Sequence, residues 1–273
     1  MPDSEPKDGR EHSGARMKKR YEPYREFLQD RVRLRIDFSK TDQSRGLPMP
    51  PIEKPFDSDA ERFDLPHHSA RETKPGVDLT AAIDHRRSRR RFLDTPLALE
   101  ELSFLLWATQ GLQQVLPSGS ARRTVPSAGC RHALETYLSV HRVAGLEPGL
   151  YRYLPVEHQL LLEYRDDQLS EKIVPATLGQ PFTGKAAAVF IWTAVPGRME
   201  WRYDIAAHKV ILLDAGHVCQ NLYLACEAIV AGTCAIAAYH QDLMDQLAGV
   251  DGQDEMVIYL APVGKIKEGV EDA

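Results

Sequence analysis

Several features that mark common protein classes are missing from this chain of 273 residues. No uninterrupted apolar run reaches the roughly 18 residues that a transmembrane helix requires, so no membrane association is expected. The four cysteines form no C-x-x-C pair and lie at no zinc-finger spacing with histidines, and no metal site is predicted. Residues 1–20 are polar and contain no apolar segment of the kind found in signal peptides. These absences together predict a reducing, cytoplasmic location.

The overall charge is modest. The chain contains 34 Lys and Arg against 39 Asp and Glu, which gives a formal net charge of -5, and 43% of its residues are hydrophobic. This is an ordinary globular composition, and its slight acidity argues against a nucleic-acid partner. Residues 86–91, Arg-Arg-Ser-Arg-Arg-Arg, are the exception and are called the arginine segment below. A helix C-terminus would account for one or two cations, so the segment is read either as a phosphate site, as a solvated helix end or as a nucleic-acid patch.

The chain is predicted to divide near residue 75. Residues 1–75 form an N-terminal extension in which residues 1–20 are expected to be disordered. A short helix carries Tyr21, Tyr24 and Leu28 at helical spacing. The stretch 41–76 is rich in proline and has no core of its own, so it is a linker or an arm laid over another surface. Residues 76–273 form the folded domain.

Within the folded domain, helices and strands are interleaved without a regular βαβ rhythm. The apolar periodicity predicts helices over 77–85, 99–110, 209–230 and 241–247. It predicts strands over 133–143, 150–154, 159–164, 185–195 and 255–263. This order favours an α+β fold over a doubly wound parallel sheet.

Two nucleotide-binding motifs can be set aside. Residues 179–185 match G-x-x-x-x-G-K, but Ala186 follows where a P-loop needs Ser or Thr, and the next segment is an apolar strand. No G-x-G-x-x-G follows a strand, which argues against a Rossmann dinucleotide site.

Two further motifs carry polar or small residues. Pro126-Ser127-Ala128-Gly129, called the small-residue loop below, allows a flat ligand to approach the backbone, although a plain loop is the simpler interpretation. Asp214, His217 and Asn221 share one helix face, which we interpret as a capped or dimer-facing polar stripe with a structural histidine.

Six short sequence motifs, in a fixed order along the chain, resemble those of a known family. They are IDHRRSRRRF (83–92), PLALEELSFLLWATQG (96–111), PSAGCRHALETYL (126–138), GLYRY (149–153), LLDAGHVCQNLYLACEAIVAGTCAI (212–236) and YLAPVGK (259–265). The chain resembles the nitroreductase superfamily, specifically its SagB-type dehydrogenase branch, over about residues 78–265. The resemblance implies an FMN-dependent oxidoreductase with a mostly antiparallel central sheet flanked by helices. It also implies a homodimer with the flavin at the subunit interface, and NADH or NADPH as the transient reductant.

The resemblance also implies roles for individual residues. Arg86, Arg87 and Ser88 match the positions that hold the FMN phosphate and ribityl chain, and Arg90 matches the basic residue at the pyrimidine edge of the ring. The small-residue loop matches the segment that faces the flavin, in the partner subunit. Further cofactor contacts are expected at Cys234, Ala235, Ile236, Ala237, Gly264 and Lys265. Arg89 and Arg91 have no assigned role and are expected to be solvated.

One position departs from the branch. Peptide-azoline oxidases carry a Lys-Tyr pair that transfers protons, and here the pair is Arg202-Tyr203. Arginine does not lose its proton in proteins, so Tyr203 remains the candidate proton donor or relay, beside a purely packing role. The resemblance therefore favours reduction of a small electron-poor acceptor such as a nitroaromatic or quinone. The alternatives are a peptide-azoline dehydrogenase and a catalytically degenerate flavin-binding scaffold.

Overall fold

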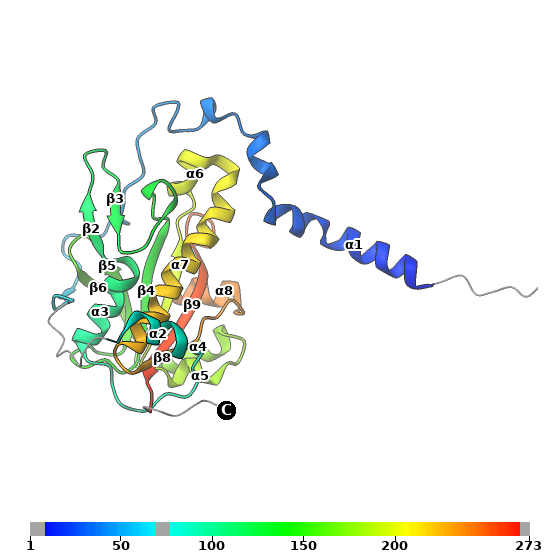
Figure 1. Cartoon of the computed structure of the whole chain (residues 1–273). Helices are drawn as coiled ribbons and strands as arrows, with labels where there is room; N and C mark the ends of the chain where they lie inside the picture. The colour runs from blue at the N-terminus through cyan, green and yellow to red at the C-terminus, as the bar shows by residue number, and fades with distance from the viewer. Residues whose placement is uncertain (1–8, 69–76, 268–273) are drawn as a thin grey trace, which may run out of the picture.

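An antiparallel sheet of seven strands forms the centre of the molecule in the computed structural model, which describes residues 9–68 and 77–267 (Figure 1). Its order is β1-β6-β5-β4-β7-β9-β8. The strands are β1 (Arg62–Asp64), β4 (Leu134–Val140), β5 (Gly149–Leu154), β6 (Gln159–Arg165), β7 (Ala188–Ala194), β8 (Ala231–Thr233) and β9 (Met256–Lys265). A separate hairpin pairs β2 (Leu112–Val115) with β3 (Ala121–Arg123). The predicted α+β class and the mostly antiparallel sheet are confirmed.

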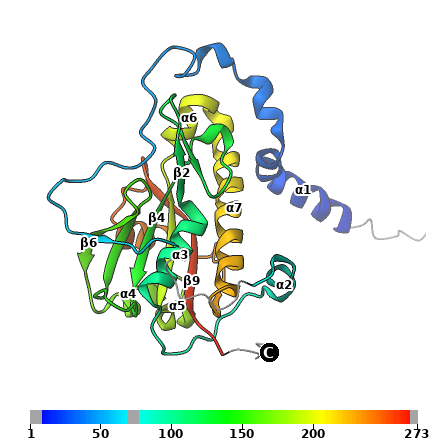
Figure 2. The same ribbon diagram turned by 60° about the vertical axis from the view of Figure 1, so that its left-hand side comes forward.

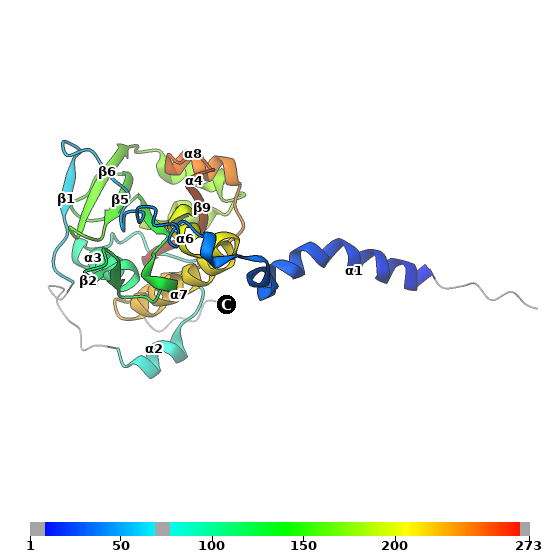
Figure 3. The ribbon, with the colours of Figure 1, turned by 90° about the horizontal axis from the view of Figure 1, so that it is seen from above.

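Helices cover both faces of the sheet. Figure 3, seen from above, separates α3 and α7 on one side from α4 and α8 on the other. The helices of the folded domain are α2 (Leu79–His85), α3 (Leu99–Gln110), α4 (Leu169–Ala176), α5 (Pro181–Lys185), α6 (Gly197–Tyr203), α7 (Ala207–Glu227) and α8 (Gln241–Ala248). None of the helices in the described residues is both long and apolar enough to cross a membrane.

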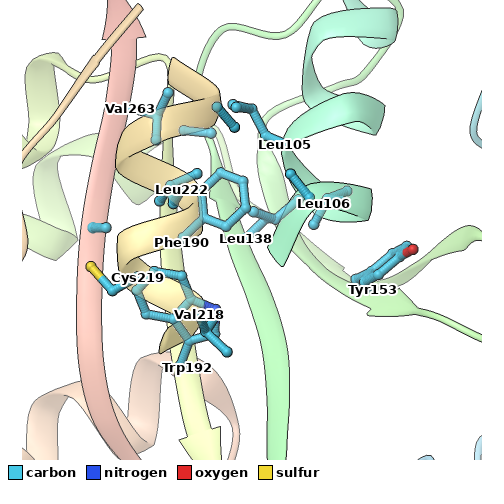
Figure 4. Close-up of a cluster of buried hydrophobic side chains, with 14 of the residues drawn as sticks. Leu105, Leu106, Leu138, Tyr153, Phe190, Trp192, Val218, Cys219, Leu222 and Val263 are labelled. Carbon is cyan, nitrogen blue, oxygen red and sulfur yellow. The ribbon is translucent and has the colours of Figure 1, made fainter. Parts of the chain in front are cut away.

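The position of β7 in the middle of the sheet explains why residues 186–192, Ala-Ala-Ala-Val-Phe-Ile-Trp, are all apolar. Phe190 and Trp192 point into a core with α3 and α7, whereas Val189 and Ile191 point into a second core with α4 and α8. Because side chains alternate along a strand, a strand covered on both faces needs apolar residues at every position. Figure 4 shows the first core, in which Leu222 of α7 lies beside Phe190.

The N-terminal extension begins with α1 (Gly9–Leu28), which projects away from the body (Figure 1). The expectation of disorder over residues 1–20 is wrong for residues 9–20, which are helical, and residues 1–8 lie outside the described part. The expectation rested on the lack of an apolar face. An apolar face is needed for packing on another element, whereas the backbone N–H and C=O groups of a helix pair within the helix itself. Two single turns follow, η1 (Asp30–Arg35) and η2 (Phe38–Lys40).

The proline-rich stretch lies over the folded domain and ends in β1 at the edge of the sheet. Three buried arginines of the folded domain donate hydrogen bonds to backbone carbonyls of this stretch. Arg131 Nη2 donates to Pro50 O at 3.1 Å, and Arg123 Nη2 donates to Ile52 O at 2.7 Å. Arg152 Nη1 donates to Lys54 O at 2.9 Å. The segment is thus an arm held by buried donors, the second of the two possibilities left open by its composition.

The P-loop-like motif has neither of the flanking elements that a phosphate loop needs. It follows α4, which is a helix and not a strand, and Pro181 to Lys185 within it form the short helix α5. Residues 186 and 187 then lead into β7. The geometry is therefore that of a helix-to-strand connection.

Candidate flavin site

The arginine segment lies at the C-terminal end of α7. It leaves α2 at Arg86, whose guanidinium carbon is 5.3 Å from the centre of the Tyr223 ring on α7. Ser88 forms a β-bridge with Thr233, and the Arg89 N–H donates to Thr233 O at 2.8 Å. The segment therefore runs beside β8 at the edge of the sheet, which is the reason it stays extended after α2 ends.

Tyr223 joins the arginine segment to the chain after β8. Its hydroxyl lies 2.9 Å from Ser88 Oγ and accepts a hydrogen bond from the Ala235 N–H at 2.8 Å. Ile236 pairs with Leu260 of β9 and so holds the same stretch against the sheet. The predicted cofactor segments 86–90 and 234–237 are thus brought together, although about 145 residues separate them in the sequence.

The arginines of the segment have different surroundings. Arg87 Nη1 donates to the carbonyls of Asp84 and Arg86 at 2.7 and 2.9 Å. Arg87 thus places a positive charge at the C-terminus of α2, where the helix dipole favours a cation. Arg90 is exposed, with its guanidinium carbon 5.8 Å from the centre of the Phe182 ring. Arg91 is also exposed, as expected. The expectation for Arg89 is wrong, because it is half-buried and its stem packs closely on Gly232.

An acidic residue of α7 also faces this segment. Burial raises the pKa of Glu227, while Arg89 and His85 act in the opposite direction. A half-buried carboxyl therefore supplies part of the anionic surroundings that the arginines require.

Gly264 and Lys265 reach the same end of the molecule on β9. The Lys265 carbonyl accepts from the Leu93 N–H at 2.8 Å, which ties it to the chain just beyond the arginine segment. Its ammonium donates to Glu101 Oε1 at 2.7 Å and to the carbonyl of Ile229. The ammonium thus already has partners, and a phosphate contact at Lys265 stays a prediction.

The small-residue loop lies elsewhere, beside the end of α6. Gly129 has φ +61°, and a Cβ atom there would lie 2.6 Å from the Tyr203 hydroxyl and 3.0 Å from Arg202 Cδ. Only glycine combines that backbone with so close an approach. The loop and the Arg202-Tyr203 pair, assigned separately from the sequence, thus form one cluster.

The three polar residues of α7 do not act as one stripe. Asp214 is buried against the small-residue loop; burial raises its pKa, and hydrogen bonds from Ser127 and Ala128 oppose the shift. Asn221 Nδ2 donates to Ala108 O of α3 at 2.9 Å. His217 is exposed in the single protomer, which is compatible with the dimer-facing alternative, and its structural role stays a prediction.

One protomer therefore holds the predicted residues in two clusters along α7. Asp214 marks the first and Tyr223 the second, and nine residues of helix separate them by about 14 Å. Sequence reasoning missed Tyr223 and Thr233. Tyr223 fits the apolar period of α7 and was indistinguishable from a core residue. Thr233 Oγ1 is buried and has no hydrogen-bond partner among the described residues.

Known proteins resemble this chain in sequence over most of its folded domain. The model of the nitroreductase family matches residues 83–265. The nitroreductase-like protein MJ1384 of Methanocaldococcus jannaschii is 31% identical over 189 residues, which cover 69% of this chain and 91% of that protein. The trifolitoxin-processing protein TfxB of Rhizobium leguminosarum bv. trifolii is 31% identical over 116 residues, 40% of this chain and 30% of TfxB.

A solved structure shows the same fold. A nitroreductase-like protein of Ralstonia eutropha JMP134 superposes with a TM-score of 0.62 at 26% identity, covering 81% of this chain and all of that one. The chain therefore shares its fold with this protein, and it belongs to the nitroreductase family.

Proposed function

We propose that the protein binds FMN and uses NADH or NADPH for the two-electron reduction of a small electron-poor acceptor, of nitroaromatic or quinone type. The observation that carries this proposal is the link from Ser88 through the Tyr223 hydroxyl to the Ala235 N–H. It places the proposed phosphate-binding and ring-binding segments side by side, which a single bound flavin requires.

The residues present fit the cofactor. Exposed guanidinium groups of the arginine segment and the Ser88 hydroxyl suit a phosphate ester. The buried Thr233 hydroxyl, without a partner among the described residues, offers a further donor beside them. Gly129 leaves its loop without a side chain, which permits a flat ring to approach.

Bound FMN supplies the two-electron redox chemistry, and the protein orients it and adjusts its polarity. Arg90 would be the residue at the pyrimidine edge of the bound ring, where its positive charge would stabilise negative charge. Arg202 contributes a positive charge beside Tyr203. The Tyr203 hydroxyl is the group that holds a proton for the acceptor.

A homodimer unites the two clusters. An exposed stripe of α7, formed by Leu212, Leu213, Gly216 and His217, is free to pack against a second copy. We propose that the two α7 helices pack antiparallel about a two-fold axis. The small-residue loop of one protomer then meets the arginine segment of the other, because the first cluster lies toward the N-terminal end of α7 and the second toward its C-terminal end.

Oxidation of azoline rings in peptides is the second candidate. It is favoured by the similarity to a trifolitoxin-processing protein and by Tyr203 beside the small-residue loop. The absence of the lysine expected at Arg202 argues against it.

A half-reaction screen tests the proposal. The purified chain is titrated with FMN, freed of unbound flavin and mixed without oxygen with NADH or NADPH while the flavin absorbance is followed. The reduced protein is then mixed with a nitroaromatic, a quinone or oxygen, and the oxidised protein with a thiazoline peptide. We expect bleaching by a nicotinamide and recovery with a nitroaromatic or quinone. A protein that stays colourless with FMN overturns the proposal, and loss of two daltons from the peptide favours the second candidate.

A further inference from the structure

Helix α1 carries apolar side chains that its own chain leaves uncovered. In the described part of the helix, Tyr24 is 73% exposed and Leu28 is 68% exposed, and Tyr21 and Phe27 are exposed as well. An open hollow of about 540 Å³ beside the helix and η1 is lined by charged and polar side chains and is not part of this apolar surface. Figures 1 and 3 show the helix pointing away from the body. Neighbouring exposed aromatic and leucine side chains are typical of a surface that another molecule covers.

The base of α1 is fixed at the N-terminal end of α7. Lys209 Nζ in the first turn of α7 donates to Leu28 O at 2.7 Å. A few residues later, the Arg33 guanidinium carbon lies 6.0 Å from the centre of the Tyr203 ring. The direction from which α1 leaves the body is therefore set beside the face of α7 that the proposed dimer uses (Figure 2).

Helix α2 lies at the opposite end of α7 and is also partly uncovered. It packs near Tyr223, and its outer side exposes Leu79 at 63% and Ile83 at 57%. Figure 2 shows α1 and α2 on the same side of α7, with α1 nearer the upper end of the molecule and α2 nearer the lower end. The face that α7 offers to a second copy is thus bordered by one apolar helix surface at each end.

We propose that α1 of one protomer packs on α2 of a second copy of this chain. The inference rests on the proposed antiparallel dimer. Antiparallel packing places the N-terminal end of one α7 opposite the C-terminal end of the other, and so brings α1 to the partner's α2. A helix of 20 residues is about 30 Å long, comparable with α7, so α1 is long enough to cross the partner. Two exposed apolar surfaces are covered by this single contact.

The contact has a consequence for the flavin site. Helix α2 ends at Arg86 and leads directly into the arginine segment. A helix of seven residues with few buried side chains is held weakly by its own chain. Docking of the partner's α1 on α2 therefore fixes the start of the arginine segment, and the dimer arm and FMN binding support each other.

Crosslinking between two differently tagged chains tests the contact. One chain carries Tyr24→Cys and the other Ile83→Cys, and the mixed dimer is treated with a short bismaleimide. We expect a crosslinked pair that contains both tags. The matched control replaces Ile83→Cys by Asp242→Cys, which is exposed on α8 across the sheet from α7, and wild-type chains report any reaction of the native cysteines.

Sedimentation of the same samples separates the inference from the proposed function. A dimer without the crosslink overturns the docking of α1 and leaves the flavin site as proposed. A monomer that binds FMN overturns both the docking and the dimer. A crosslink of equal yield with the Asp242→Cys control overturns the specific contact.

A second pair of variants tests the coupling to the cofactor. Tyr24→Glu with Phe27→Glu places charges in the proposed contact, while Leu34→Glu adds charge at an exposed residue of η1 outside it. We expect a severalfold higher FMN dissociation constant for the first variant and an unchanged dissociation constant for the second. Both variants should remain dimers, because the α7 helices still pack against each other. Equal FMN affinity in both variants contradicts the coupling.

Discussion

The hydroxyl of Tyr223 lies 2.9 Å from Oγ of Ser88 and at the same time accepts the N–H of Ala235 at 2.8 Å. A core helix thereby holds two distant segments of the chain at one place. The remainder of the tyrosine ring is buried in the first core, so the hydroxyl has little freedom to move. The two segments of the proposed flavin site are therefore linked through this one side chain.

Replacement of this hydroxyl is expected to affect both stability and FMN affinity. Tyr223→Phe leaves the Ala235 N–H without its acceptor, at a cost of about 1–3 kcal/mol. Tyr239→Phe is the matched control, because its hydroxyl donates to Val257 O at 2.8 Å, in the second core. Denaturant unfolding should show a loss in both variants, and flavin titration a weaker affinity only for Tyr223→Phe. Equal FMN affinities would place the site elsewhere.

Loss of a guanidinium from the arginine segment is expected to weaken FMN retention. Arg87→Ala removes a charged donor from the proposed phosphate site, worth about 1.5–3 kcal/mol, or roughly tenfold to a hundredfold in the dissociation constant. Arg91→Ala removes the same charge from an exposed residue without a proposed contact. The measurement is flavin content after gel filtration, at low and high salt. Unchanged occupancy in Arg87→Ala would remove this residue from the site.

A methyl group at Gly129 is expected to disturb turnover. Gly129→Ala strains a backbone at φ +61° and pushes against the Tyr203 hydroxyl. Gly145→Ala strains a similar backbone at φ +82°, but its Cβ would meet nothing within 4 Å. Both variants should lose about 1–2 kcal/mol of stability, and only Gly129→Ala should change the rate of acceptor reduction. Identical steady-state kinetics in the two variants would argue against a role for the loop and Tyr203.

The contact of Glu53 with the folded domain is expected to depend on pH. Glu53 Oε2 accepts from the Val156 N–H at 3.1 Å, and burial raises the pKa of Glu53 to about 7 from an ordinary value of 4.5. A raised pKa favours the protonated form on folding. This stabilisation is complete below the unfolded value of 4.5 and is lost as the pH rises through about 7.

Comparison of variants isolates this effect. In Glu53→Gln the fall in unfolding free energy between about pH 5 and 8 should be smaller than in the wild type. Glu61→Gln provides a control of opposite sign, because Arg165 lowers the pKa of Glu61 and its contribution is lost as the pH falls. If wild type and Glu53→Gln show parallel stability curves, Glu53 titrates as an ordinary exposed carboxyl.

Periodicity in the sequence was sufficient for the long elements. The helix predicted over 99–110 is α3, and the one predicted over 209–230 is α7, which begins two residues earlier and ends three residues earlier than predicted. The strand predicted over 185–195 contains β7. These elements bury one or both of their faces, so apolar residues recur along them at the spacing of a helix or a strand, and this spacing can be recognised in the sequence. The strands β1 and β8 were not predicted, because three residues are too few to establish a period. The helices α4 and α6 were not predicted either; Pro175 lies inside α4 and Pro196 directly precedes α6, and proline ordinarily argues against a continuous helical pattern.

The class of fold, the family resemblance and the residue types that suit a phosphate and a flat ring all follow from the order of the amino acids along the chain. Which of those residues meet follows from the packing of the folded chain. It joined Ser88 to Ala235 through Tyr223, joined Gly129 to Tyr203, and left these pairs at two places along α7. A local sequence pattern indicates whether a side chain is buried, because burial constrains the type of residue. It does not indicate which residues that side chain contacts, because those contacts depend on how segments far apart in the chain pack around one helix.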